Sequence, residues 1–201
     1  MYRTLAAALL CALAIALPAS ARDVPTGLSS RLDAQLQANR ERYGIAGQAV
    51  LVAHNGKVLY QGASGERDPA THAPATVDTI FASQSVAKLL TSTLVMQLVE
   101  QGKVDLDAPA SRYVPDLPSA WQSISVRDFL NHSSGIGEYA DRRDGHWISK
   151  GYDGMAPDLA SALKVAGAAP LIFATGSRVQ YTQANYLVLT ALLEAHYRKP
   201  Y

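Results

Sequence analysis

The chain has 201 residues, and 48% of them are apolar, which is enough to build one or two domains with a hydrophobic core. Its 18 basic and 17 acidic side chains give a net charge of +1. This balance does not favour a nucleic-acid partner or a strongly charged substrate channel, because both need an excess of one sign.

The N-terminus has the pattern of an export signal. Arg3 supplies a positive start, residues 5–17 form an apolar run too short to span a bilayer comfortably, and Ala19-Ser-Ala21 offers small residues for cleavage. We expect cleavage after Ala21, which would leave residues 22–201 in the periplasm or the extracellular space, without a stable membrane span. An uncleaved anchor is the alternative.

The next part of the chain predicts a helix followed by a hairpin. Residues 31–43 have leucines at mixed helical spacing, and residues 47–54 predict a strand. The strand ends at Asn55-Gly56, the strongest short hairpin signal, so residues 57–61 should form the returning antiparallel strand. We interpret the turn-rich stretch 62–78 as a surface loop.

A longer helix is predicted to start at residue 85 and to stop at Gly102, a residue type common just after a helix. We expect this helix to be mostly buried, because its apolar residues recur at helical spacing over a broad stripe. These residues are Leu89, Leu90, Leu94, Val95, Leu98 and Val99. Residues 104–118, rich in Asp and Pro, should be irregular.

Three further helices are predicted in the rest of the chain. A capping box that begins at Ser125 opens a short helix over residues 126–131. The long polar and aromatic stretch 135–154 is interpreted as a loop. Helices are then expected over residues 157–166 and 183–197, the second with a buried side rich in leucine.

Ser85 and Lys88 stand one turn apart on one face of the long helix. A serine is a weak nucleophile until a base removes its proton, and a lysine held out of water near positive charge loses its own proton more easily. The helix N-terminus also favours developing negative charge. The pair could therefore be a nucleophile and its base. The spacing alone is not specific, since Ser161-Ala-Leu-Lys164 repeats it in a segment that we interpret as an ordinary helix.

Several motifs follow one another in order along the chain: Ser85-Val-Ala-Lys88, the segments 97–107 and 113–118, Asn131-His-Ser-Ser-Gly135, and Tyr181-Thr-Gln183. Together they resemble the penicillin-recognising serine hydrolases, in the branch of class C β-lactamases, D-alanyl-D-alanine carboxypeptidases and related esterases. The resemblance runs over residues 28–201. It implies an α/β (α+β) fold of the β-lactamase/transpeptidase type, with an antiparallel sheet flanked by helices and a further helical region.

The resemblance also implies roles for particular residues. Tyr181 would pass the proton to the leaving group, either as a phenolate or by relay through Lys88, because nearby positive charge can lower a phenol pKa. Gln183 stands where the family most often has an asparagine that contacts the lysine and the substrate. Glutamine keeps the amide with a different reach, which bears on substrate preference before catalysis. His132 is expected to have a structural hydrogen-bonding role, and residues 135–154 would form either a substrate rim or an ordinary surface loop.

One motif of the family is missing. Its members carry Lys or His, then Thr or Ser, then Gly, on a strand near the C-terminus, and no such tripeptide follows Tyr181. That strand would supply the second oxyanion-hole N–H beside that of Ser85. Without it, the strands over residues 47–61 would keep an open edge. We therefore expect the sequence to be the N-terminal portion of a serine hydrolase domain.

No metal or cofactor site is predicted. The five histidines have no metal-ligand spacing, and the chain has no glycine-rich phosphate loop. The only cysteine, Cys11, lies in the export signal, so the exported chain would have no thiol chemistry.

The sequence thus predicts an exported serine hydrolase that acts through an acyl-enzyme on a β-lactam, a D-alanyl peptide or a small ester or amide. Ser85 would attack, Lys88 would assist as base, Tyr181 would protonate the leaving group and Gln183 would contact the substrate. The partner would be a small-molecule or peptidoglycan-derived substrate and no nucleic acid, with the oligomeric state left open. The alternative is a truncated, non-catalytic remnant with a peptidoglycan-binding or regulatory role.

Overall fold

The computed structural model describes residues 26–201. These residues fall into two compact units that meet in sequence between Phe81 and Ala82. The predicted export signal, with its cleavage site after Ala21, lies outside the described residues. In the part of the chain that is described, no helix combines the length and the apolar character needed to cross a membrane.

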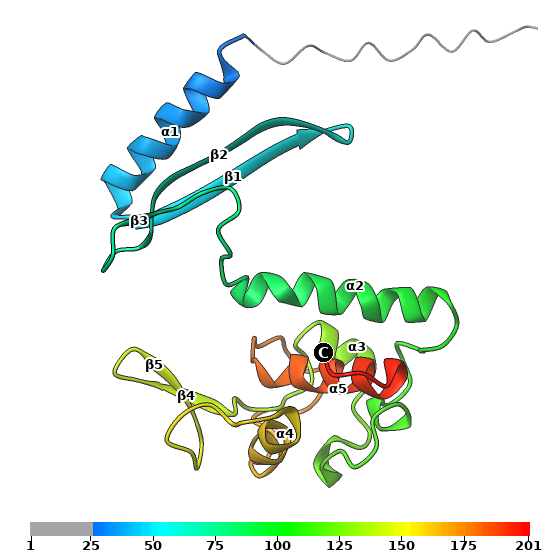
Figure 1. Ribbon diagram of the computed structural model, residues 1–201. Coiled ribbons are helices and arrows are strands. Elements are labelled where there is room, and N and C mark those ends of the chain that lie inside the picture. Colours follow the sequence, from blue (N-terminus) through cyan, green and yellow to red (C-terminus); the bar gives the residue numbers. More distant parts are fainter. Residues whose placement is uncertain (1–25) are drawn as a thin grey trace, which may run out of the picture. The chain divides into compact units, whose positions relative to one another are not determined.

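The first unit is a helix on a small antiparallel sheet. Helix α1 (Leu28–Tyr43) lies along strands β1 (Gly47–His54) and β2 (Lys57–Asp68), and a short strand β3 (Ala73–Pro74) pairs with the far end of β2 (Figure 1). Tyr60 ties the two layers together, because its buried side chain donates a hydrogen bond of 2.6 Å to Asp33 Oδ1 on the helix. The predicted helix and hairpin are both present.

The hairpin turn at Asn55-Gly56 has φ angles of 48° and 74°, as a two-residue type I′ turn requires. The prediction that residues 62–78 form a loop was wrong in its first part, because β2 continues to Asp68. Gly65 is a residue type common in turns, but here it lies within the sheet. It pairs with Gly47 on β1 at a φ of 88°, and a Cβ atom there would collide with the carbonyl of Ala46. This glycine permits a close backbone approach inside the sheet.

The second unit is mostly helical and is built around α5 (Ala184–Tyr197). This helix packs against α2 (Ala87–Glu100), α3 (Val126–Leu130) and α4 (Leu159–Gly167), as Figure 1 shows for α2 and α5. The core between them consists of fully buried apolar side chains, among them Val95, Leu98, Trp121, Phe129, Val188, Leu189 and Leu192. Burial of these side chains is the main source of stability for the unit.

Caps set the helix ends in this unit. Ser125 Oγ accepts a hydrogen bond of 3.1 Å from the Asp128 N–H and starts α3, as the capping box predicted. Asp158 Oδ1 accepts from the Ser161 N–H at 2.7 Å and starts α4. Gly102, at a φ of 68°, follows the end of α2. Its conformation lets the next N–H groups bond back to the carbonyl of Leu98.

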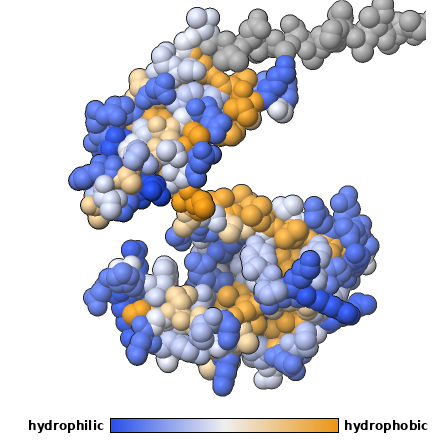
Figure 2. Space-filling view, viewed as in Figure 1, coloured by the Kyte–Doolittle hydropathy of each residue, from blue (hydrophilic) through white to orange (hydrophobic). Residues whose placement is uncertain are grey.

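The expectation that the long helix is mostly buried was wrong. Of its apolar side chains, Val95 and Leu98 are fully buried, whereas Leu89 and Leu90 are 68% and 65% exposed. The apolar stripe is wider than the side of α2 that faces α5, and nothing else in the second unit covers the remainder. Figure 2 shows hydrophobic residues gathered along this helix.

The stretch 135–154 is not simply a loop, because it contains the hairpin of β4 (Ala140–Arg143) and β5 (His146–Ser149). Its turn, Asp144-Gly145, has φ angles of 47° and 82° and is again of the two-residue kind. Asp-Gly is a known hairpin signal. It was missed because the residues before it, Asp141 to Arg143, are charged and do not alternate with apolar ones.

Candidate active site

Ser85 and Lys88 lie where the second unit begins its first long helix. Ser85 is in the 3-10 turn (Gln84–Val86) that directly precedes α2, two residues before the first residue of that helix, and its side chain is exposed. Lys88 is half-buried in the first turn of α2, with its Nζ 3.3 Å from Ser85 Oγ. Gln84, just before the serine, has a φ of 47°. This conformation is uncommon for a residue with a side chain and is frequent at functional sites.

The segment before α5 brings the other two predicted residues to this serine. The Tyr181 hydroxyl is 2.7 Å from Ser85 Oγ. Gln183 Oε1 accepts a hydrogen bond of 2.5 Å from Lys88 Nζ and lies 3.4 Å from the Tyr181 hydroxyl. Ser85, Lys88, Tyr181 and Gln183 therefore form one connected group, although 93 or more residues separate the two pairs in sequence.

The environment of Tyr181 favours loss of its proton. Burial raises the pKa of the phenol, but hydrogen bonding with Lys88 and Ser85 and the positive charge of Lys88 outweigh burial and hold the pKa below its ordinary value of 10.0. The Lys88 Nζ atom also lies 5.2 Å from the centre of the Tyr181 ring. A phenol that ionises more easily, in contact with a serine hydroxyl, can act as a general base.

The ring of His132 packs against the ring of Tyr181. Its ring centre is 4.6 Å from that of Tyr181, and its Nδ1 faces the Asn185 Nδ2 group at 3.0 Å and the Thr182 N–H at 3.5 Å. Burial and the charge of Lys88 lower the pKa of His132 from 6.5, so the ring is neutral near pH 7 and Nδ1 accepts. These contacts agree with the structural hydrogen-bonding role expected from the sequence.

A buried polar network joins the motif at 131–135 to the start of α5. Ser134 Oγ donates to Asn185 Oδ1 at 2.5 Å, and Asn185 Nδ2 donates to Thr182 Oγ1 at 2.8 Å. Ser134 and Asn185 are both fully buried, so each bond compensates for the loss of water. The network fixes the chain just after Tyr181.

The sequence of the chain matches a known family. A family model described as Beta-lactamase matches residues 32–201. The chain belongs to the Beta-lactamase family. The family resemblance predicted from the ordered motifs is therefore confirmed.

Relatives in the Beta-lactamase family include hydrolases with different names. The chain is 35% identical over 168 residues to the esterase EstB of Burkholderia gladioli, covering 78% of this chain and 43% of the relative. Among solved structures it resembles EstCE1, a hydrolase with promiscuous acyltransferase activity, at 28% identity and a TM-score of 0.71, covering 85% of this chain and 47% of that one. It also resembles the D-amino acid amidase of Ochrobactrum anthropi SV3, at 25% identity and a TM-score of 0.71, over 86% and 46%.

These comparisons confirm the predicted fold class, a β-lactamase/transpeptidase-like arrangement of helices and antiparallel strands. The chain spans less than half the length of each of these three relatives. By name the three relatives are an esterase, a hydrolase and an amidase, so their coarse class of chemistry, hydrolysis, is the class predicted from the sequence.

Glu138 is a site residue that sequence reasoning missed. Its Oε2 atom accepts a hydrogen bond of 2.6 Å from the Gln183 N–H, and its Oε1 atom accepts one of 3.1 Å from the Tyr139 N–H. The side chain is half-buried, and burial raises its pKa above the ordinary value of 4.5 despite both bonds. The signal was a lone acid just after the Asn131-His-Ser-Ser-Gly135 motif, but its partner is 45 positions away.

The second Ser-x-x-Lys sequence does not form a comparable site. Ser161 and Lys164 lie in α4, where Lys164 is exposed and the Ser161 N–H is used to cap the helix. Among the hydrogen bonds of the described residues, none joins the Ser161 hydroxyl to a tyrosine. The interpretation as an ordinary helix agrees with this arrangement.

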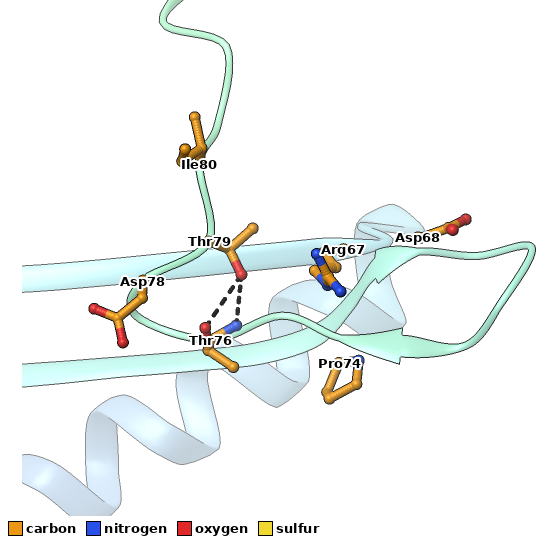
Figure 3. Close-up of a pocket in the computed structure, with 7 residues that line it drawn as sticks. All are labelled: Arg67, Asp68, Pro74, Thr76, Asp78, Thr79 and Ile80. Carbon is orange, nitrogen blue, oxygen red and sulfur yellow. Dashed lines mark hydrogen bonds between the residues drawn. The ribbon is translucent and has the colours of Figure 1, made fainter.

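A separate pocket lies in the first unit and has a volume of about 670 Å³ (Figure 3). Its lining combines Thr76 and Thr79, whose side chains and backbone bond to each other, with Arg67 and Asp68. Asp68 is already bonded to the Ala70 N–H and to a threonine hydroxyl. The lining includes no nucleophile with a base. Within residues 26–201, no cluster of His, Cys, Asp and Glu is arranged to hold a metal ion.

Proposed function

We propose that the protein is a serine hydrolase that works through an acyl-enzyme on Ser85. One observation carries the proposal: Ser85 Oγ lies between the Tyr181 hydroxyl at 2.7 Å and Lys88 Nζ at 3.3 Å. An exposed serine in contact with a phenol of lowered pKa and a cation has the elements of an activated nucleophile.

Tyr181 is the group that takes the serine proton. Its oxygen is closer to Ser85 Oγ than Lys88 Nζ is, and the lysine already donates to Gln183 Oε1 and Ser85. The positive charge of Lys88 beside the phenol contributes to the lowered pKa of Tyr181. Lys88 therefore assists as an electrostatic partner, and the phenolate of Tyr181 is the general base.

The reaction then follows from these positions. The Ser85 proton moves to Tyr181 while Oγ forms a bond to the substrate carbonyl carbon, whose oxygen becomes an oxyanion. Collapse breaks the bond to the leaving group, which takes the proton from Tyr181 and departs as an alcohol or amine. Water adds to the acyl-enzyme, gives its proton to Tyr181, and Ser85 leaves with that proton restored.

The substrate class is a small ester or amide, with D-alanyl and other D-amino acyl groups favoured over β-lactams. The esterase EstB and the D-amino acid amidase among the relatives support this choice. Gln183 bears on it directly, because its Oε1 is engaged by Lys88 and its amide NH₂ is left to donate to a substrate carbonyl. Export to the periplasm or outside the cell rests on the sequence pattern of residues 3–21.

Labelling with a fluorophosphonate tests the proposal. Intact mass before and after exposure should show one adduct on the wild type, none on Ser85→Ala, and one on the matched control Ser161→Ala. An adduct that survives Ser85→Ala would contradict the proposal. A protein that takes no adduct in any form would favour the non-catalytic, peptidoglycan-binding alternative, which retention on peptidoglycan fragments would then test.

A further inference from the structure

Backbone hydrogen bonds join residues 180–183, the segment that carries Tyr181, to the loop 132–138. Three backbone N–H groups of residues 180–183 bond to the loop 132–138: Gln180 N–H to the His132 carbonyl at 3.0 Å, Thr182 N–H to His132 Nδ1 at 3.5 Å, and Gln183 N–H to Glu138 Oε2 at 2.6 Å. The last bond is the shortest and uses a carboxylate, which accepts more strongly than a neutral group.

The carboxylate of Glu138 has a fixed position. Its other oxygen accepts from the Tyr139 N–H, and its backbone carbonyl accepts from Lys150 Nζ at 2.9 Å. Half-burial disfavours the ionised form and raises the pKa of this carboxyl, while the hydrogen bonds from the Gln183 and Tyr139 N–H groups and the charges of Lys88 and Lys150 favour the ionised form. A carboxylate kept under such conditions, in contact with a site segment, is a candidate for a functional role.

Glu138 also replaces a missing part of a helix cap. In a capping box, the third residue of the helix accepts a hydrogen bond from the N–H of the cap residue. The cap residue of α5 is Gln183, and the third helical residue is Tyr186, whose hydroxyl instead bonds Ser92. The Gln183 side chain is engaged by Lys88. Glu138 supplies the acceptor from a separate loop.

We propose that Glu138 is a positioning residue of the active site: its carboxylate fixes the backbone at Gln183, so that Tyr181 reaches Ser85 and the Gln183 amide reaches Lys88. This inference rests on the proposed function, because it assigns Glu138 a part in the same reaction. Glu138 touches neither reacting atoms nor substrate and acts through the two side chains that it positions.

The hydrogen bond that Glu138 accepts from the Gln183 N–H and the negative charge of its carboxylate should have opposite effects on the pKa of Tyr181. This difference allows an experiment to separate the two contributions. The charged and titratable groups that face this carboxylate are Lys88, Lys150, Tyr139 and Tyr181. The negative charge of Glu138 raises the pKa of Tyr181, but by less than contact with Lys88 and Ser85 lowers it. Losing the charge alone should lower that pKa further, whereas losing the position should raise it.

Two variants test this difference. Glu138→Gln keeps an acceptor for the Gln183 N–H without the charge, and Glu138→Met keeps the length of the side chain without an acceptor. Glu138→Ala replaces the Met variant if the latter does not fold. Asp158→Ala is the matched control, because Asp158 also accepts a backbone N–H at a helix start, but at the start of α4 and away from the site.

The Tyr181 phenol is titrated by NMR of ¹³C-labelled tyrosine, and Tyr181→Phe assigns its signal. The rate of fluorophosphonate labelling is measured on the same variants. We expect the Tyr181 midpoint to fall in Glu138→Gln, to rise in Glu138→Met, and to stay unchanged in Asp158→Ala. Labelling should slow about tenfold or more in Glu138→Met only.

The positioning role would be overturned if the titration midpoint of Tyr181 were unchanged in Glu138→Met, or fell as it should in Glu138→Gln. It would also be overturned if Glu138→Met were labelled at the same rate as the wild type. If the wild type takes no label, the proposed function fails. The titration needs no turnover, so a raised midpoint in Glu138→Met would still support the positioning role, and any other result would overturn it.

Discussion

Replacing Tyr181 with phenylalanine removes one oxygen atom from the contact with Ser85 and leaves the aromatic ring. The lost contacts are the bond of 2.7 Å to Ser85 Oγ and the weaker one of 3.4 Å to Gln183 Oε1. Tyr181 is 52% exposed, and its ring keeps its packing with the ring of His132, 4.6 Å between the ring centres, so the free energy of unfolding should change by less than about 0.5 kcal/mol. The effect on the reaction should be far larger than the effect on the fold.

General acid–base catalysis contributes about 10²–10⁴ in rate, or about 3–5 kcal/mol of activation free energy. We expect Tyr181→Phe to slow hydrolysis of a p-nitrophenyl ester, and labelling by a fluorophosphonate, by that factor. Tyr113→Phe is the control, because its hydroxyl accepts a bond of 2.8 Å from the Asp105 N–H away from the site. A loss of less than about threefold in Tyr181→Phe, or an equal loss in Tyr113→Phe, would refute Tyr181 as the general base.

Three further outcomes follow from the same contacts. Lys88→Ala should abolish labelling of Ser85, while Lys164→Ala, in the second Ser-x-x-Lys sequence, should label as the wild type does. Leu189→Ala in the core should lower the free energy of unfolding by about 2–5 kcal/mol in urea, and exposed Leu89→Ala by less than about 0.5 kcal/mol. Because folding lowers the pKa of His132 below 6.5, the unfolded state binds its proton first. Stability should therefore fall as pH falls from 6.5 towards the lowered value, and His132→Gln should show a weaker fall in urea titrations between pH 7 and 5.

Elements with local signals were predictable from the sequence. Asn55-Gly56 set a hairpin because both residues tolerate a positive φ, and Ser125 set a helix start because its hydroxyl bonds within the same turn. The failures had a common cause. Both depend on contacts with distant parts of the chain. Gly65 is a turn residue by type, but its role is to allow close approach of the β1 backbone, and the exposure of Leu89 depends on what packs against α2 and not on the periodicity of α2 itself.

The site divided in the same way. The Ser85 and Lys88 pair could be argued from spacing on one helix, but Tyr181 was found only through the order of motifs that resemble a family. Glu138 was missed because its role depends on the backbone N–H of Gln183, and a backbone group leaves no mark in the sequence. Only the folded chain brings that N–H to the carboxylate.

The two residue pairs of the proposed active site come from the starts of two different helices. The reaction therefore tolerates only a small shift of one helix relative to the other. Ser85 and Lys88 lie at the start of α2, Tyr181 and Gln183 lie just before α5, and the two helices pack against each other. A slip of one residue along a helix axis is a shift of about 1.5 Å, more than half of the 2.7 Å between the two reacting oxygens. The bond of 2.9 Å between Ser92 on α2 and Tyr186 on α5 opposes such a slip one turn into the interface. Substitutions deep in this interface would therefore act as defects of alignment, lowering the reaction rate at temperatures where the protein is still folded.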